Sequence, residues 1–182
     1  MTQTEQSQGI IGVINMPKVL DLSVLKQEVV KNEKYNIVLL DRIQDPGNLG
    51  TIIRTADAAG IEWILLAKGT VDAYNPKVVR STAGSILNIK LIEVDPIKDA
   101  LNLLKTFGVN VIATTLEGAV DYGEPSSYKR FNCLVIGNEA NGESNEIIEL
   151  SDARVKIPIY GSAESLNASV AAGIMMYKLN SL

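Results

Sequence analysis

Short apolar runs rich in Val, Ile and Leu recur along this chain, separated by longer segments in which apolar residues return every three or four positions. Short runs bounded by turn residues are typical of buried β-strands, whereas the longer spacing is typical of helices. The expected strands span residues 37–40, 63–67, 89–94, 109–114, 133–136 and 154–157. Because strands that alternate with helices form a mostly parallel sheet covered on both faces, the pattern predicts one α/β layered domain.

Capping residues indicate where the helices between these runs begin. The first helix is expected to begin at Pro46, with Asp45 as its cap, and to end at Gly60. A second is expected to begin at Pro76. The side chains expected to be buried by these two helices are Leu49, Ile52, Ile53 and Ala56 in the first and Val78, Val79, Thr82 and Ile86 in the second. Further helices are expected over residues 97–107, 143–150 and 165–179, with a loop over residues 117–130.

The first 35 residues are expected to be peripheral, apart from a strand-like piece at residues 10–14 and an amphipathic stretch at residues 19–30. The chain of 182 residues has 46% apolar residues, enough for one domain with its own core. Its apolar runs are too short to cross a membrane, and its start lacks the pattern of a signal peptide. We therefore expect a cytoplasmic protein without a membrane partner.

The side-chain inventory limits the chemistry that is possible. The chain contains no histidine, which removes the commonest general base, and a single cysteine, Cys133, in an apolar run. We expect no metal site and interpret Cys133 as a buried structural thiol. A net charge of −4 and a sequence pI near 4.9 argue against a surface that holds nucleic acid by electrostatics alone.

Two glycines interrupt the first expected helix, where each costs about 1 kcal/mol relative to alanine. At helical spacing, Gly47, Gly50 and Arg54 lie on one face, so the glycines could leave room for a ligand beneath Arg54. Alternatively, Arg54 is a surface residue above a tight contact between helices. Asn48, near the start of the helix, could hold a carbonyl group, orient Arg54 or serve as a cap.

A second candidate segment follows the strand expected at residues 133–136. Gly137, Asn138 and Glu139 are followed by Gly142, but Glu143 stands where a phosphate-binding loop would have Lys. That loop type is therefore excluded. A carboxylate at the carboxyl end of a strand could hold a ribose or an amine, although tight turns also collect Gly and Asn.

A third segment, residues 157–177, places polar side chains at the start of the last expected helix. The unpaired N–H groups of a first helical turn, together with Ser165, Asn167 and Ser169, could bind a polar ligand. The alternative is an ordinary cap in front of a buried helix.

Together the three segments resemble the motifs of the SpoU family of RNA ribose methyltransferases. The first motif contains Asn48, Gly50 and Arg54, the second contains Gly137 to Gly142, and the third runs from Ile157 to Ser169. They occur in the family's order, and the resemblance covers residues 8–182. Residues 75–85 resemble the helix that faces RNA in the family.

The resemblance implies an S-adenosylmethionine cofactor, a deep trefoil knot near the C-terminus and a homodimer with active sites at its interface. Spacing alone would not suggest the knot, because knotted chains are rare. The family's catalytic positions fall on Arg54, Asn48, Glu139, Ser165 and Asn167. Its cofactor positions fall on Thr114, Thr115, Leu116, Gly137, Asn138, Glu139, Ile157, Ile159, Gly161, Leu166 and Ala168.

The implied reaction is methyl transfer to a ribose 2′-hydroxyl. Because a guanidinium is hard to deprotonate in a protein, our hypothesis is that Arg54 stabilises the developing alkoxide and grips the adjacent phosphate. Asn167 and Ser165 would position the hydroxyl and the cofactor, and Glu139 would shape the cofactor loop.

The amino-acid sequence of the third motif resembles the branch of the family that acts on large-subunit (23S) ribosomal RNA more than the branch that acts on tRNA. Residues 1–35 would then be an extension or the remnant of a linker to a missing RNA-binding domain, and residues 36–182 the catalytic domain. The alternatives are a tRNA methyltransferase, a catalytically silent RNA-binding homodimer of the same fold, and an α/β enzyme for an unrelated nucleotide.

Overall fold

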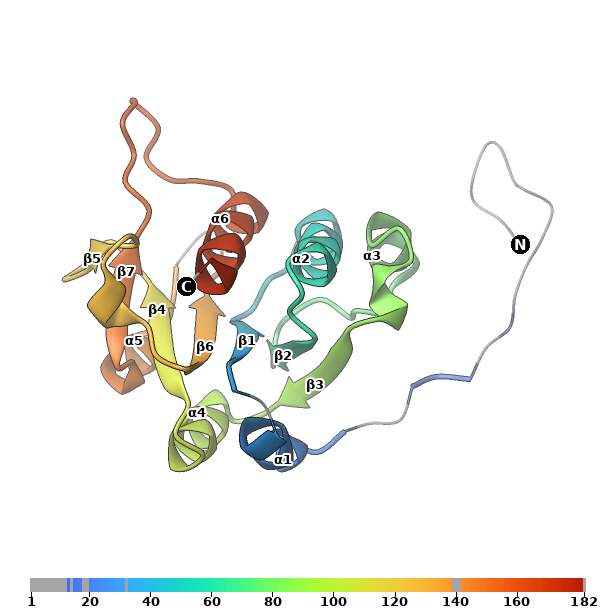
Figure 1. Ribbon diagram of the computed structural model, residues 1–182. Coiled ribbons are helices and arrows are strands. Elements are labelled where there is room, and N and C mark those ends of the chain that lie inside the picture. The colour runs from blue at the N-terminus through green and yellow to red at the C-terminus, as the bar shows by residue number, and fades with distance from the viewer. Residues whose placement is uncertain (1–12, 14, 18–19, 32, 139–141, 182) are drawn as a thin grey trace.

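The computed structural model describes residues 13–181 apart from 14, 18–19, 32 and 139–141. Its centre is a seven-stranded sheet in the order β3-β2-β1-β6-β4-β7-β5, and all neighbouring strands run parallel (Figure 1). The strands are β1 (Tyr35–Leu40), β2 (Trp63–Ala67), β3 (Lys90–Val94), β4 (Asn110–Thr114), β5 (Val120–Asp121), β6 (Phe131–Ile136) and β7 (Ala153–Lys156). The predicted mostly parallel α/β sheet is confirmed.

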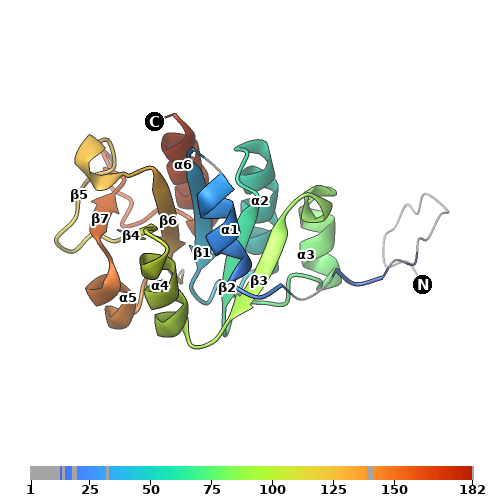
Figure 2. The ribbon, with the colours of Figure 1, turned by 60° about the horizontal axis from the view of Figure 1, so that its bottom comes forward.

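Helices cover both faces of the sheet, as predicted (Figures 1 and 2). One face carries α2 (Pro46–Ala58), α3 (Pro76–Ser81) and α6 (Ala168–Asn180), and the other carries α1 (Val24–Lys31), α4 (Ile97–Thr106) and α5 (Asn145–Leu150). Two short 3₁₀ helices, η1 (Ser85–Leu87) and η2 (Pro125–Ser127), lie in the connections.

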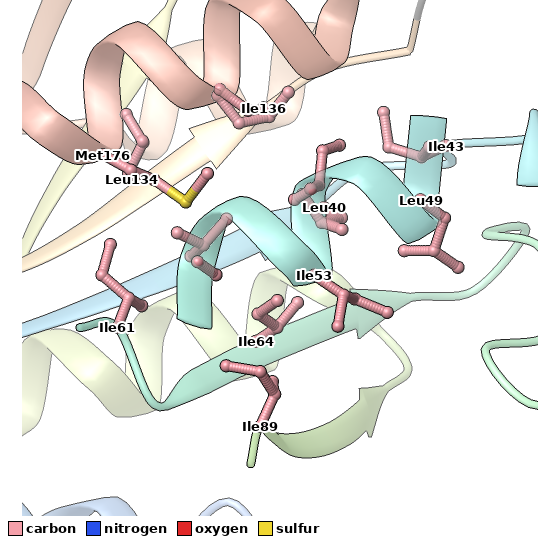
Figure 3. Close-up of a cluster of buried hydrophobic side chains, with 14 of the residues drawn as sticks. Leu40, Ile43, Leu49, Ile53, Ile61, Ile64, Ile89, Leu134, Ile136 and Met176 are labelled. Atoms are coloured by element: carbon pink, nitrogen blue, oxygen red, sulfur yellow. The ribbon is translucent and has the colours of Figure 1, made fainter. Parts of the chain in front are cut away.

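Alternate residues of each central strand build two separate cores. In β1, Val38 and Leu40 pack under α2 and α6, while Ile37 and Leu39 pack under α1 and α4. Figure 3 shows part of the first core, where Met176 of α6 lies near the side chains of α2 and the sheet. Burial of each Leu or Ile side chain stabilises the fold by about 1.5–3 kcal/mol. Because both faces of the sheet are covered by helices, nearly every residue of a central strand is apolar.

The predicted elements match the structure closely, with a few exceptions. The predicted loop at residues 117–130 contains β5, a two-residue edge strand on β7 that is too short to leave a pattern in the sequence. The second helix ends at Ser81, and Ile86 lies in η1. Val79 is 38% exposed, so its predicted burial is wrong. The strand-like piece at residues 10–14 falls mostly outside the described residues.

A ladder of asparagines fastens the C-terminal helix to the amino end of the sheet. Asn110, Asn132 and Asn36 lie opposite one another on β4, β6 and β1. Asn110 Nδ2 donates to Asn132 Oδ1 at 3.2 Å, and Asn132 Nδ2 donates to Asn36 Oδ1 at 3.0 Å. Asn36 Nδ2 then donates to Asn180 Oδ1 at 3.1 Å. Because buried polar groups are costly unless paired, this chain fixes where α6 ends.

The two glycines of α2 have different surroundings. A Cβ on Gly50 would lie 2.3 Å from Ser81 Cβ and 2.9 Å from the carbonyl oxygen of Val78, so Gly50 permits a tight contact with α3. Gly47 is half-buried beside its own cap, Asp45. For Gly50, the structure therefore supports the contact between helices and not an opening for a ligand beneath Arg54.

We expect the substitution Gly50→Ala to destabilise the protein by about 2 kcal/mol. Overpacking against α3 costs about 1–3 kcal/mol, and the better helix propensity of alanine offsets at most about 1 kcal/mol. Urea unfolding followed by circular dichroism measures the change. The control is Thr51→Ala, an exposed position of the same helix, where a change within about 0.5 kcal/mol is expected. A Gly50→Ala variant as stable as the wild type would contradict the close contact.

Candidate functional site

Two predicted site residues from opposite ends of the chain meet where α2 and α6 begin. Asn167 Nδ2 donates a hydrogen bond to Asn48 Oδ1 over 3.0 Å. The two residues are 119 positions apart in the sequence. They lie side by side because α6 packs along α2, as Figure 1 shows. The structure thus brings the first and third motifs together.

Each of these asparagines is held by the start of its own helix. Asn167 is the N-cap of α6, and its Oδ1 accepts from the main-chain N–H of Ser169 at 2.9 Å and from the Ser169 hydroxyl at 2.6 Å. The main-chain N–H of Asn48 donates to Asp45 Oδ1 at 2.8 Å. Because the cap fixes Asn167 Oδ1 on its own helix, the Nδ2 group is directed toward α2. The ordinary cap is therefore present, and it also orients a contact with the first motif.

A pocket of about 150 Å³ opens between the ends of β4 and β7 and the segment that leads to α6. Seven of the predicted site residues line it: Thr114, Thr115, Leu116, Ile157, Ile159, Ser165 and Leu166. Four lining residues were not predicted: Val155, Lys156, Glu164 and Ala171. Pockets that enclose whole ligands usually measure roughly 300–1,000 Å³, so this one can enclose only part of a cofactor-sized molecule.

Gly137 and Asn138 lie outside the pocket lining and shape the loop after β6. A Cβ on Gly137 would lie 2.5 Å from the main-chain atoms of Gly142 and Glu143, so this position requires glycine. Asn138 exchanges main-chain hydrogen bonds with Gly142, and its side-chain amide donates to the carbonyl oxygen of Arg42 at 2.8 Å. The second motif therefore builds a tight turn that is fastened to the end of β1.

The remaining predicted cofactor residues that the structure describes are not among those that line the pocket. Gly161 lies in an exposed segment, and a Cβ there would meet no atom within 4 Å. Ala168, the first residue of α6, is buried in the core and does not line the pocket. Glu139, predicted for both catalysis and cofactor binding, lies outside the described residues.

Arg54 is exposed on α2, and its direction relative to Asn48 follows from helix geometry. A helix turns about 100° per residue, so Arg54 points about 40° from Gly50 and about 120° from Asn48. Gly50 faces α3, whereas Asn48 and Thr55 face α6. In a single copy of the chain, Arg54 therefore lies on the α3 side of the helix.

Sequence reasoning missed Glu143, a buried carboxyl group behind the pocket. Its Oε1 accepts from the main-chain N–H of Thr114 at 2.7 Å. The pKa of Glu143 is raised to about 7, chiefly by burial; the hydrogen bonds from Thr114 oppose this rise, and the charge of Asp41 contributes to it. The only signal in the sequence was an acidic residue directly after the glycine that ends the second motif.

The described residues contain no group of three or more His, Cys, Asp or Glu side chains that could hold a metal ion. Cys133 is fully buried, and burial raises the pKa of its thiol to about 12, which fits the predicted structural thiol. Within the described part of the chain, no helix is both long and apolar enough to span a bilayer.

A larger cavity, of about 570 Å³, lies elsewhere, at the carboxyl ends of β2 and β3. It contains none of the predicted site residues, and its Lys68 is paired with Asp95 at 2.8 Å. We therefore assign the candidate site to the smaller pocket, which seven of the predicted site residues line.

The pKa of Glu143 predicts how stability depends on pH. Between pH 4.5, the ordinary pKa, and pH 7, the unfolded chain releases this proton while the folded chain retains it. The free energy of unfolding should therefore fall as the pH rises through this window, by up to about 3 kcal/mol. Glu143→Gln removes the charge but keeps the shape, so the variant should be more stable than the wild type at pH 8 and similar to it at pH 5.

Thermal or urea unfolding at several pH values tests this expectation. Glu146→Gln, which removes an exposed carboxylate from the first turn of α5, is the control and should leave the pH dependence unchanged. Equal pH dependence in Glu143→Gln and the wild type would show that the carboxyl group is ionised normally.

Comparisons with known proteins agree with the geometry. The model of the SpoU rRNA Methylase family matches residues 35–177. The 23S rRNA (guanosine(2553)-2′-O)-methyltransferase RlmP of Bacillus subtilis is 39% identical over 98% of this chain and 67% of its own length. An AdoMet-bound rRNA methyltransferase from Sinorhizobium meliloti superimposes with a TM-score of 0.78 at 40% identity, over 82% of this chain and 57% of that one.

The methyltransferase AviRb from Streptomyces viridochromogenes, in complex with AdoMet, gives a TM-score of 0.77 at 33% identity, over 85% of this chain and 63% of its own. The chain thus spans about three fifths of the length of these solved structures. The family model covers most of the chain. The chain belongs to the SpoU rRNA Methylase family.

Proposed function

We propose that this chain carries the catalytic domain of an S-adenosylmethionine-dependent methyltransferase that modifies a ribose 2′-hydroxyl of 23S ribosomal RNA in the cytoplasm. The observation that carries the proposal is the contact between Asn48 and Asn167, which joins two motifs of the matched family beside a pocket. The choice of RNA rests on RlmP, whose name specifies 23S rRNA and 2′-O-methylation.

The pocket suits part of the proposed cofactor. Its walls carry the apolar side chains of Leu116, Ile157, Ile159 and Leu166, among which a flat adenine ring could be buried. Ser165 and the carboxylate of Glu164 add polar groups at the same pocket, which suits a cofactor that is apolar at one end and charged at the other. Bound S-adenosylmethionine would supply an electrophilic methyl group on a sulfonium centre.

The residues around the pocket would prepare the hydroxyl group for attack. A ribose hydroxyl is a weak nucleophile at neutral pH, so its developing negative charge must be stabilised. In our proposal the guanidinium of Arg54 does this and grips the adjacent phosphate, while Ser165 and Asn167 orient the hydroxyl. The amide of Asn167 is already held by its cap and by Asn48, so it needs little reorganisation. Glu139 retains its proposed role in shaping the cofactor loop.

A homodimer would supply Arg54 from the second subunit. In one copy Arg54 points toward the α3 side of α2 and away from Asn167. The outer side of α6 exposes Val170 at 49% and Tyr177 at 57%, apolar surface that a second copy could cover. We therefore propose that each active site combines the pocket of one subunit with the arginine of the other.

Two finer features belong to the same proposal. The segment between β7 and α6 would form the trefoil knot of the family, since it returns the chain from the far side of the sheet to α2 (Figure 1). Residues 36–182 would be the catalytic domain, and residues 1–35 an extension or linker remnant. Part of that extension nevertheless packs on the domain, because Leu25 of α1 is fully buried in the second core.

Calorimetry and a methyl-transfer assay test the function. We expect micromolar binding of S-adenosylmethionine and transfer to 23S rRNA in preference to tRNA. Arg54→Lys should keep the cofactor affinity and lower turnover at least about a hundredfold, because lysine lacks the bidentate geometry. Arg130→Lys, an exposed arginine directly before β6 and at the opposite end of the sheet from the pocket, is the control and should keep most of the turnover. Absence of cofactor binding would favour a silent RNA-binding protein, and near-normal turnover of Arg54→Lys would refute the role of the arginine.

A mixed dimer tests whether Arg54 acts across the interface. Arg54→Ala and Asn167→Asp, which keeps the oxygen of the α6 cap, should each be inactive as a pure dimer. Coexpression with two affinity tags yields the mixed dimer, in which one of two sites receives an intact arginine and an intact asparagine. That dimer should show about half of the wild-type turnover. If both residues act within one subunit, one protomer's substitution cannot be compensated by its partner, and the mixed dimer stays inactive.

A further inference from the structure

A carboxyl group that the proposed mechanism does not use lies directly behind the pocket wall. The side chain of Glu143 is only 8% exposed, and its Oε1 accepts from the main-chain N–H of Thr114 at 2.7 Å. Thr114 is the last residue of β4 and lines the pocket together with Thr115 and Leu116. Glu143 therefore holds the part of the main chain that forms the wall.

The packing around Glu143 keeps it in this position. A Cβ on Gly137 would lie 2.7 Å from Glu143 Cγ, so the side chain of Glu143 passes over a residue of the β6 turn that has no side chain. Solvation by water is not available to a carboxyl group buried in this way, and folding must replace it with hydrogen bonds.

Among the described residues, only one oxygen of the carboxyl group has a hydrogen-bond partner. Oε2 of Glu143 is buried and has no hydrogen-bond partner among the described residues. The pKa of the group is accordingly raised to about 7, chiefly by burial and in smaller part by the buried carboxylate of Asp41. Asp41 is itself paired with Arg42 at 2.8 Å. The charged side chains on the elements around this site are Asp41 and Arg42 after β1, Arg154 and Lys156 on β7, and Glu146 and Glu149 on α5.

The hydroxyl of Thr114 connects the charge of Glu143 to the pocket wall. Thr114 Oγ1 lies 2.9 Å from the carbonyl oxygen of Val135 and 3.1 Å from Glu143 Oε1. A hydroxyl has one proton and can donate to only one of these acceptors. An ionised Glu143 attracts this proton more strongly than a neutral one does, so ionisation would draw the hydroxyl from β6 toward the carboxylate.

We infer that Glu143 is a positioning residue of the cofactor site, which holds the end of β4 through Thr114 and releases its proton to solvent when a cationic cofactor enters the pocket. The inference rests on the proposed function, because it takes S-adenosylmethionine as the occupant. It adds a residue that acts through Thr114 and without contact to the cofactor.

The sign of the effect follows from electrostatics. The sulfonium group gives the cofactor a positive charge, and a positive charge near a buried carboxyl group favours the ionised form. Binding therefore lowers the pKa of Glu143, and by linkage the affinity increases as the pH rises. A decrease of about one unit corresponds to a tenfold gain in affinity between acid and alkaline pH and to release of about half a proton at pH 6.5.

Calorimetry of S-adenosylmethionine binding, in buffers with different ionisation enthalpies between pH 5.5 and 8, measures both quantities on the full chain. Between pH 5.5 and pH 8, the affinity of the wild type for S-adenosylmethionine should increase about tenfold more than the affinity of Glu143→Gln does. The comparison with Glu143→Gln cancels the titration of the cofactor's own amino group, which affects both proteins equally. The control Glu146→Gln should behave as the wild type.

Each outcome decides the inference. Loss of the proton release in Glu143→Gln and its retention in Glu146→Gln support it, and equal release in the wild type and Glu143→Gln overturns it. If S-adenosylmethionine does not bind at any pH, both the proposed function and this inference are contradicted. If it binds with an affinity that does not change with pH, only this inference is contradicted. If Glu143→Gln does not fold, ¹³C-carboxyl NMR of the wild type decides: a glutamate that titrates near pH 7 must move to lower pH on addition of cofactor.

Discussion

The packing of α6 along α2 is the contact on which the rest of the site depends. The two helices share one side of the sheet, and their buried residues belong to one core. Gly173 of α6 faces Thr55 of α2, and a Cβ on Gly173 would lie 3.4 Å from Thr55 Cγ2. At one end of the pair Asn48 meets Asn167, and at the other end Asn180 bonds to the carbonyl oxygen of Ala59 and to Asn36. Both ends of α6 are thereby fixed, so the segment before it must pass over the ends of β4 and β7, where the pocket lies.

The polar groups at this edge of the sheet show how much of the site is structural. Asp41 is 3% exposed and forms two hydrogen bonds with the guanidinium of Arg42, which itself has a positive φ of 56°. The carbonyl oxygen of Arg42 accepts from Asn138. The turn of the second motif is thus attached to β1 through a residue in a conformation that is uncommon outside glycine. Such an arrangement holds a loop in place without contacting a ligand, which explains why a predicted cofactor residue can lie outside the pocket lining.

Much of the fold could be predicted from the sequence because the physical causes are local. Apolar strands buried on both faces, Pro at the first helical position and Asp45 or Asn75 as caps all leave a mark within a few residues. Val79 was mispredicted because helix α3 ends after Ser81, too early for the helical spacing that would bury Val79 and Ile86 on one face. Strand β5 depends on pairing with β7 alone, which no local pattern records.

The candidate site was predictable only through its motifs. Its residues come from segments more than one hundred positions apart, and spacing within each segment says nothing of which side chains will touch. Two glycines illustrate this. Gly50 and Gly137 stand out in the sequence as parts of motifs, but only the structure shows that Gly50 leaves room for α3 and Gly137 leaves room for Glu143. The surroundings that set the pKa of Glu143 also come from distant parts of the chain. Thr114 is the last residue of β4, and Asp41 directly follows β1.

The direction of Arg54 places a geometric limit on any chemistry in a single copy. Six residues separate it from Asn48, which corresponds to a rise of about 9 Å along α2 in addition to the rotation toward α3. The pocket lies on the other side of that helix, beyond α6 and against β4 and β7. A guanidinium that started from this point would have to reach around its own helix to approach a group held by Asn167. In the homodimer that we propose, a second subunit on the exposed side of α6 would bring its own arginine to the pocket without that detour.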